Sequence, residues 1–163
     1  MDVSLENRTW WEFIDKDLQE LLRESTLLRQ TVRGWKEKFL DYSFIVFPVA
    51  KAYEGFLKKL FLKLGFITND EYLGKRFRVG KALNPALEWE IREKESIYDK
   101  VANYCGGKDT ADCLWNTWRV SRNLLFHWFP NERNMITFEE ANERVDAILS
   151  AMDIAFKECR MEE

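Results

Sequence analysis

Apolar residues recur at helical spacing from the first residues of the chain. Up to Gly34 they fall three or four positions apart, which is the period of one face of an α-helix. Thr9 and Glu12 have the spacing of a capping box. We therefore predict a first helix that begins at this box and ends at Gly34.

The same signals continue along the next hundred residues. Residues 35–64 are predicted to form a long helix closed by Gly65, which Pro48 should kink or restart. Residues 66–83 are polar and irregular, and we expect a loop there. Asn84 followed by Pro85 is typical of a helix start, and this helix should end near residue 104.

Two more helices complete the pattern. Asp109 or Thr110 should cap a helix that continues to Pro130, and Thr137 with Glu140 predicts a capping box for the last helix. No segment alternates with the period of two that strands show. No repeat, low-complexity tract or Gly/Ser/Pro-rich linker interrupts the chain. The prediction is one all-α domain over residues 1–163, a bundle of about five helices.

Composition and charge narrow the class of protein. Hydrophobic residues make up 46% and charged residues 33%, as in ordinary globular chains. The net charge of −3 argues against binding nucleic acid through the overall field, but allows a local basic site. The first residues lack the basic region of a signal peptide, and no apolar run is long enough to cross a membrane. We expect a cytoplasmic protein with no membrane partner.

The three cysteines are Cys105, Cys113 and Cys159. Their number is odd and their spacing does not match a zinc site, so they are expected to be reduced, structural thiols. Cys105 and Cys113 could approach each other across the turn at residues 106–107. No metal ligand set and no cofactor motif is found, so no metal and no cofactor is predicted.

The chain has a single histidine, His127. On a helical wheel it falls on the polar face of its helix, together with Arg119, Arg122 and Asn123. The two arginines could hold a phosphate, and Asn123, four residues before His127, could orient the imidazole. A histidine beside a phosphate-binding arginine suits metal-free RNA cleavage, in which the ribose 2′-hydroxyl attacks its own phosphate.

The spacing of Arg122 and His127 resembles the Arg-x(4–6)-His signature of the HEPN superfamily, including the polar Asn123 directly after the arginine. The segment from Phe47 to Leu60 looks like the core helix of RnlA-type HEPN toxins. Together the resemblance covers about residues 35–160. It implies a HEPN-like helical-bundle endoribonuclease that works as a homodimer, with two Arg/His motifs facing a shared cleft.

The resemblance also implies a partner and a further site residue. RnlA-type toxins act with an antitoxin or in antiviral defence, and they use a glutamate of the core helix. By position that glutamate is Glu54, which also borders the apolar stripe of its predicted helix. The alternative for Glu54 is an ordinary salt bridge to a neighbouring basic residue.

One local basic patch stands out in the predicted loop. Lys75, Arg76 and Arg78 alternate with aromatic Tyr72 and Phe77, a combination that suits single-stranded RNA. A solvated loop beside a glycine turn explains the same residues.

Three hypotheses for the function follow. The first is a metal-independent endoribonuclease toxin or defence effector, in which His127 is the acid or base, Arg122 binds phosphate, and Asn123, Arg119 and Glu54 assist. The second is a non-catalytic HEPN-like module that binds a nucleotide or a protein through the same face. The third is a structural dimerisation domain.

Overall fold

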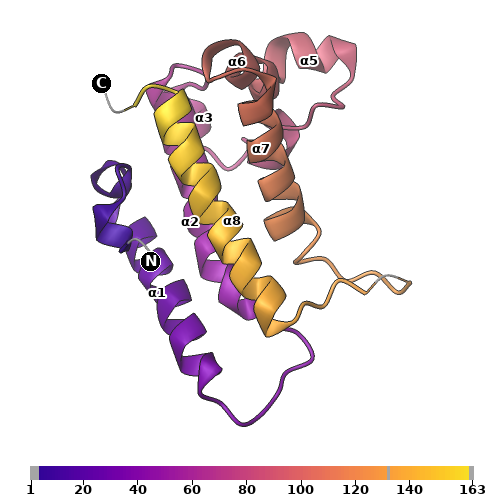
Figure 1. The fold of residues 1–163 in the computed structure, drawn as a ribbon. Coiled ribbons are helices and arrows are strands. Elements are labelled where there is room, and N and C mark those ends of the chain that lie inside the picture. Colours follow the sequence, from indigo (N-terminus) through magenta and orange to yellow (C-terminus); the bar gives the residue numbers. More distant parts are fainter. Residues whose placement is uncertain (1–3, 132, 162–163) are drawn as a thin grey trace.

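Two long helices, α2 (Ser43–Lys63) and α8 (Phe138–Glu158), run side by side through the centre of the molecule, as Figure 1 shows. The computed structural model describes residues 4–131 and 133–161. The helix α1 (Lys16–Arg33) packs on one side of this pair and α7 (Lys108–Trp118) on the other. Within the described residues the chain is helical and has no β-strand, so the predicted all-α class and helical bundle are confirmed. The expected number of about five helices is too low, because the described residues form the eight α-helices α1–α8.

Shorter elements cover the ends of these four helices. Two 3-10 turns, Leu5–Asn7 (η1) and Trp11–Phe13 (η2), precede α1. Between α2 and α7 the chain forms α3 (Asn69–Leu73), α4 (Val79–Ala82), α5 (Trp89–Glu95) and α6 (Ile97–Tyr104). A π-helix, η3 (Arg119–Asn123), follows α7 directly. Buried side chains of all the long helices and of the N-terminal turns form one core cluster.

The predicted start of the first helix is wrong, although its end at Gly34 is confirmed. Thr9 and Glu12 lie around a 3-10 turn, and α1 begins only after Asp15. The reason is tertiary: Trp10 is completely buried, and its indole nitrogen donates to Asp153 at 2.6 Å. Trp10 and the neighbouring Trp11 therefore fill the core from an irregular segment and do not form the apolar stripe of a helix.

The second predicted helix is shorter than expected. Residues 35–42 are irregular and carry exposed apolar side chains, including Leu40 at 80% exposure, so they do not form a core-facing stripe. Asp41 accepts hydrogen bonds from the backbone and side chain of Ser43, where α2 begins. Pro48 lies inside α2, which continues through it to Lys63. Pro48 removes one hydrogen bond of the helix, and the many buried side chains that follow it in α2 continue to hold the helix in the core.

The expected loop at residues 66–83 contains α3 and α4. Thr68 and Glu71 form a complete capping box at the start of α3. Downstream, Asn84 accepts a hydrogen bond from the backbone of Ala86 in a local turn and does not start a helix. The predicted single helix to residue 104 is divided at Ser96, whose side chain caps α6.

At α7 the predicted caps Asp109 and Thr110 are also wrong. The helix begins at Lys108, directly after Gly107, whose φ of +89° suits glycine. Thr110 is buried, so its side chain lies under the helix start and not at its cap. At α8, by contrast, the predicted capping box of Thr137 and Glu140 is confirmed.

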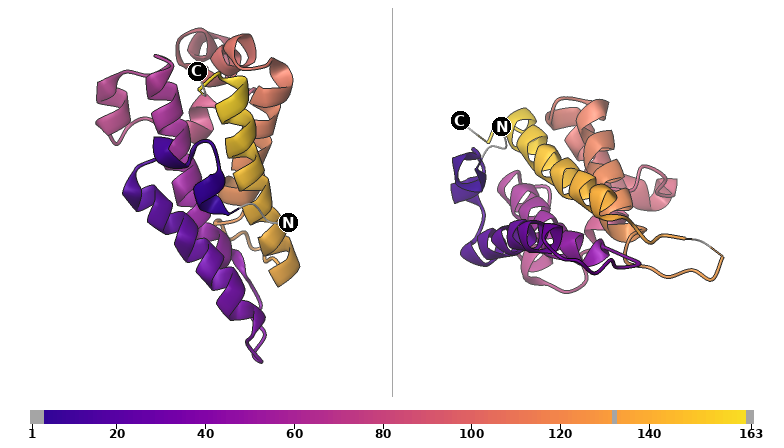
Figure 2. Two further views of the ribbon diagram at one scale, coloured as in Figure 1. Left: turned by 60° about the vertical axis from the view of Figure 1, so that its left-hand side comes forward. Right: turned by 60° about the horizontal axis from the view of Figure 1, so that its bottom comes forward.

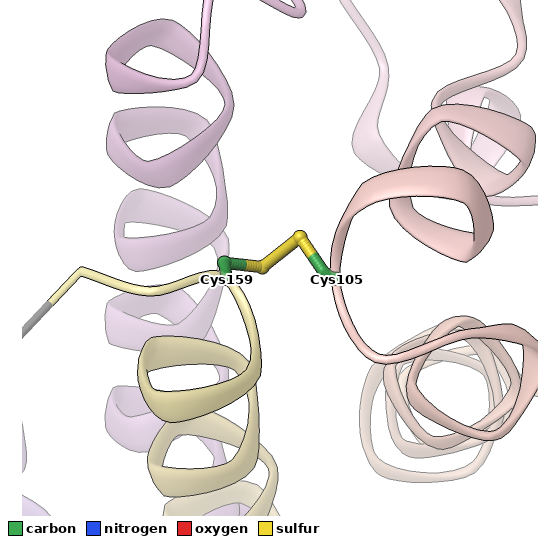
Figure 3. Close-up of a disulfide and its surroundings, with 2 residues drawn as sticks. All are labelled: Cys105 and Cys159. Carbon is green, nitrogen blue, oxygen red and sulfur yellow. A yellow bond between two sulfur atoms is a disulfide. The ribbon is translucent and has the colours of Figure 1, made fainter.

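A disulfide joins the end of α6 to the end of α8. Cys105 and Cys159 are bonded, with their Cα atoms 4.3 Å apart, as Figure 3 shows. The expectation that all three cysteines are reduced is therefore wrong, and Cys113 on α7 is the free thiol. Disulfides are typical of oxidising environments, so the predicted cytoplasmic location loses the support of the thiols. Among the described helices, none is long and apolar enough to span a membrane.

Tyr98 and Asp112 connect α6 to α7 through a titratable hydrogen bond. The Tyr98 hydroxyl donates to Asp112 Oδ1 at 2.6 Å. Burial and then this bond raise the pKa of Tyr98 to about 12. Because the folded protein holds the phenolic proton more tightly than the unfolded chain, whose tyrosine pKa is about 10, this stabilisation is present below pH 10 and is lost as the pH rises toward 12.

We therefore expect the free energy of unfolding of the wild type to fall by about 2 kcal/mol more than that of Tyr98→Phe between about pH 10 and 12. Urea unfolding of both proteins across this range measures the difference, and other lysines and tyrosines cancel in it. Parallel curves for the two proteins would contradict the assignment.

Candidate functional site

An ion pair between α2 and η3 is the centre of the candidate site. Arg122 Nη2 donates to Glu54 Oε2 at 2.6 Å. Lys58, one turn further along α2, places its Nζ 3.7 Å from the other carboxylate oxygen. The side chains of Glu54 and Arg122 are 27% and 37% exposed, so the pair lies at the surface but is partly shielded from water. A glutamate and an arginine 68 residues apart in sequence are thus brought into contact.

Arg122 also stacks on an aromatic ring. Its guanidinium carbon lies 4.8 Å from the ring centroid of Trp118, which is only 5% exposed. The indole also packs against Tyr53 of α2 and against Gly80 of α4. A Cβ at Gly80 would lie 2.4 Å from Trp118 Nε1, so any side chain there would displace the indole. The stacking and the ion pair together fix the orientation of the guanidinium.

Tyr53 lies directly under this arrangement. Its hydroxyl donates to the backbone carbonyl of Leu114 at 3.2 Å, which ties α2 to α7. Burial raises the pKa of Tyr53 well above its usual range, so the phenol stays neutral. Tyr53 therefore supports the site as a fixed hydrogen-bond donor and not as an acid or base.

The helix that carries Arg122 does not continue to His127, contrary to the prediction. It widens into η3, where the backbone N–H of Leu124 bonds to the carbonyl of Arg119, five residues earlier. After a turn at residues 124–126 the chain is irregular. Because a π-helix turns less per residue than an α-helix, the helical wheel does not describe this segment. The expected one-turn relation between Asn123 and His127 is therefore wrong.

Asn123 follows Arg122 directly in the sequence, and His127 comes four residues after Asn123. Both side chains are exposed. In the part of the chain that the structure describes, neither side chain makes a hydrogen bond or an ion pair. The imidazole lies near the ring of Phe129, with 6.0 Å between centroids. Phe126, the residue before it, packs edge-on against Phe47 of α2 at 5.5 Å. The histidine is therefore anchored through its neighbour and is open to solvent.

One side of α2 carries both Glu54, which pairs with Arg122, and Phe47, which packs against Phe126. Phe47, Lys51, Glu54 and Lys58 recur at intervals of three or four residues, so they share one side of the helix. Lys51 Nζ lies 5.7 Å from the Phe47 ring centroid. We refer to Glu54, Lys51, Lys58, Trp118, Arg122 and Phe126 as the Arg122 surface. Its two lysines and one arginine outnumber its one carboxylate, which suits an anionic ligand.

The remaining predicted substrate-binding residues are exposed. Arg119 is the first residue of η3, and Lys75, Arg76 and Arg78 lie between α3 and α4. A shallow hollow of about 360 Å³ beside them is lined by Lys75, Arg76 and Phe77, but also by the acids Asp70 and Glu71. Within the described residues no hydrogen bond or ion pair joins these cations to Arg122, so they form a separate patch of mixed charge.

Sequence reasoning missed the two α2 lysines and Trp118. A local signal existed for each: Lys58 follows Glu54 by four residues, and Arg122 follows Trp118 by four. Among the described residues no group of three or more His, Cys, Asp or Glu could hold a metal ion.

Comparison of the whole chain with known protein families, with curated proteins and with solved structures finds no match.

Proposed function

We propose that the chain is a metal-independent endoribonuclease of the HEPN type. The observation that carries the proposal is the ion pair of Arg122 with Glu54. It joins the arginine of the Arg-x4-His motif to the glutamate of the segment that resembles the core helix of RnlA-type toxins. A π-helix at this point also supports the proposal, since such distortions are frequent at functional sites.

The roles follow from the chemistry of each side chain. Arg122 would bind the scissile phosphate and stabilise the charge that develops when the ribose 2′-hydroxyl attacks. Glu54 and Trp118 hold its guanidinium in place, and Lys51 and Lys58 add positive charge along α2. His127 is exposed to solvent and would act as general acid or base. Asn123 and Arg119 would contact the flanking phosphates.

The exposed position of His127 fits a site completed by a second copy of the chain. The structure places no contact between the side chains of His127 and Arg122 in the described residues. In a homodimer the histidine of one copy would meet the phosphate held near the arginine of either copy. The proposal extends to a toxin or defence role, with RNA as substrate and an antitoxin as partner. A chain that stays monomeric at high concentration would rule out the shared cleft.

A second candidate function is a non-catalytic binding module on the same surface. It is favoured by one observation: Arg122 already has a carboxylate and an aromatic ring as partners. A guanidinium that already has such partners can contribute to a protein interface without taking part in a reaction.

Cleavage of a mixed RNA pool in EDTA tests the first proposal. We expect the wild type to leave 2′,3′-cyclic phosphate ends and to spare DNA, which lacks the attacking hydroxyl. Arg122→Ala and His127→Ala should each lower the rate by about 100-fold or more, because each removes a charge-stabilising or proton-transferring group. Gel analysis of end-labelled RNA measures the rate.

The control is Lys157→Ala, which removes an exposed cation of α8 away from this surface. It should cut like the wild type. No cleavage by a folded, dimeric wild type would favour the binding module. Equal cleavage by all four proteins would show that a contaminating nuclease is responsible.

A further inference from the structure

A second candidate site lies between α1, α8 and the N-terminal turns. There the structure holds a cavity of about 780 Å³, which is within the size range of small-molecule sites. Both helices pack against α2, and the left view of Figure 2 shows α1, α8 and the N-terminal turns. Residues of all three line the cavity. It shares no residue with the Arg122 surface.

The lining of this cavity is strongly cationic. Arg8, Arg23, Arg29 and Arg33 all contribute to it. Glu6 is the acidic residue among the described residues that line the cavity. Three of these arginines have carboxylate partners, so within the described residues the charge without a partner is that of Arg33. A cation without a partner in a concave site attracts anions.

The arginines are held in place by partners on the opposite wall. Arg29 donates through Nε to Asn142 and through Nη1 to Asp146, both at 2.8 Å, which ties α1 to α8. Arg8 forms an ion pair with Asp153. A guanidinium has five N–H donors, so one or two bonds leave others for a ligand. The walls are thus positioned in advance, which lowers the entropic cost of binding.

Of the other two arginines, Arg33 is the more available. Arg33 is exposed and forms no ion pair within the described residues. Arg23 bonds to Glu20 at 2.5 Å, and its Nε lies 3.5 Å from a carboxylate oxygen of Glu6. The Ser4 hydroxyl, which donates to Glu6, lowers the pKa of that carboxyl, so it stays an anion. Two carboxylates therefore already neutralise Arg23.

Apolar and amide side chains complete the walls. Leu5, Leu27, Phe138 and Leu149 offer apolar contact, and Thr26, Gln30 and Asn142 offer hydrogen bonds. A bare anion would leave these groups unused. We propose that the cavity binds a phosphate ester that carries a ring, of about the size of a mononucleotide, with its phosphate at Arg33.

Calorimetric titration of the full chain with AMP, adenosine and inorganic phosphate, all at one ionic strength, tests this proposal. We expect AMP to bind at least about tenfold more tightly than adenosine or phosphate, because it alone uses both kinds of wall. Arg33→Glu should weaken AMP binding by about tenfold or more, while adenosine changes little. Lys16→Glu, the same charge reversal at an exposed position of α1 outside the cavity, should bind like the wild type.

Several outcomes would overturn the proposal. These are no AMP binding at millimolar concentration, equal affinity for AMP and either part of it, or equal loss in Lys16→Glu and Arg33→Glu. Circular dichroism of each variant shows whether the fold is kept, and Arg33→Gln, which removes the charge without reversing it, repeats the test if Arg33→Glu is unfolded. Arg122→Ala should bind AMP as the wild type does, so this result is independent of the ribonuclease proposal.

Discussion

Replacing Cys105 and Cys159 by serine is expected to lower the free energy of unfolding by about 4 kcal/mol. The bond links positions 54 residues apart, from the end of α6 to the end of α8. In the unfolded chain it closes a long loop, and the entropy that this loop loses is what stabilises the fold. Both cysteines are buried, so their replacement also leaves hydroxyl groups in an apolar environment.

Thermal unfolding measures the effect. A loss of this size in a chain of 163 residues should lower Tm by about 8–16 °C. The wild type in excess reductant should melt at nearly the same temperature as the double variant. Cys113→Ser, which removes the free thiol, is the matched control and should change Tm little. If reductant and the double substitution both leave Tm unchanged, the disulfide does not contribute to stability.

Trp118→Ala is expected to destabilise the fold by about 3–5 kcal/mol and to reduce RNA cleavage as well. The indole is nearly buried between Tyr53 and Gly80, so its loss opens a cavity at the junction of α2, α4 and α7. It also removes the ring on which Arg122 stacks. Arg122 would keep its bond to Glu54 but lose the stacking contact that helps to orient its guanidinium.

The two effects can be separated with Trp118→Phe. A phenyl ring fills much of the volume and can still stack with a guanidinium, so this variant should recover most of the stability and of the cleavage. Urea unfolding and the cleavage rate, measured below the midpoint of unfolding, give the two readouts. A folded Trp118→Ala protein with the cleavage rate of the wild type would show that the stacking does not position Arg122.

Local sequence signals were sufficient where a helix boundary depends on its own residues. The capping box of Thr137 and Glu140 begins α8, and Gly34 ends α1, because each satisfies backbone groups within one turn. The same motif at Thr9 and Glu12 failed. There the neighbouring tryptophans are buried in the core, and that packing outweighs the gain from a cap.

For the candidate site, the sequence supplied residues and the tertiary structure supplied their relations. Arg122 and His127 could be named from their spacing, and Glu54 from a resemblance together with its place at the edge of an apolar stripe. That Glu54 meets Arg122 depends on how α2 packs against η3, which no local pattern encodes. The π-helix between Arg119 and Asn123 was likewise not signalled by the apolar period of the segment.

The sequence by itself determined the helical class, the beginning of α8, the end of α1 and the residue types available for chemistry, since these follow from periodicity and short-range hydrogen bonds. Only the tertiary structure decided which cysteines pair, which carboxylate holds Arg122 and that four arginines of α1 and the N-terminal segment surround one cavity. These are contacts between residues far apart in the chain. They form because burial of the core brings the helices together, and no spacing along the sequence specifies that geometry.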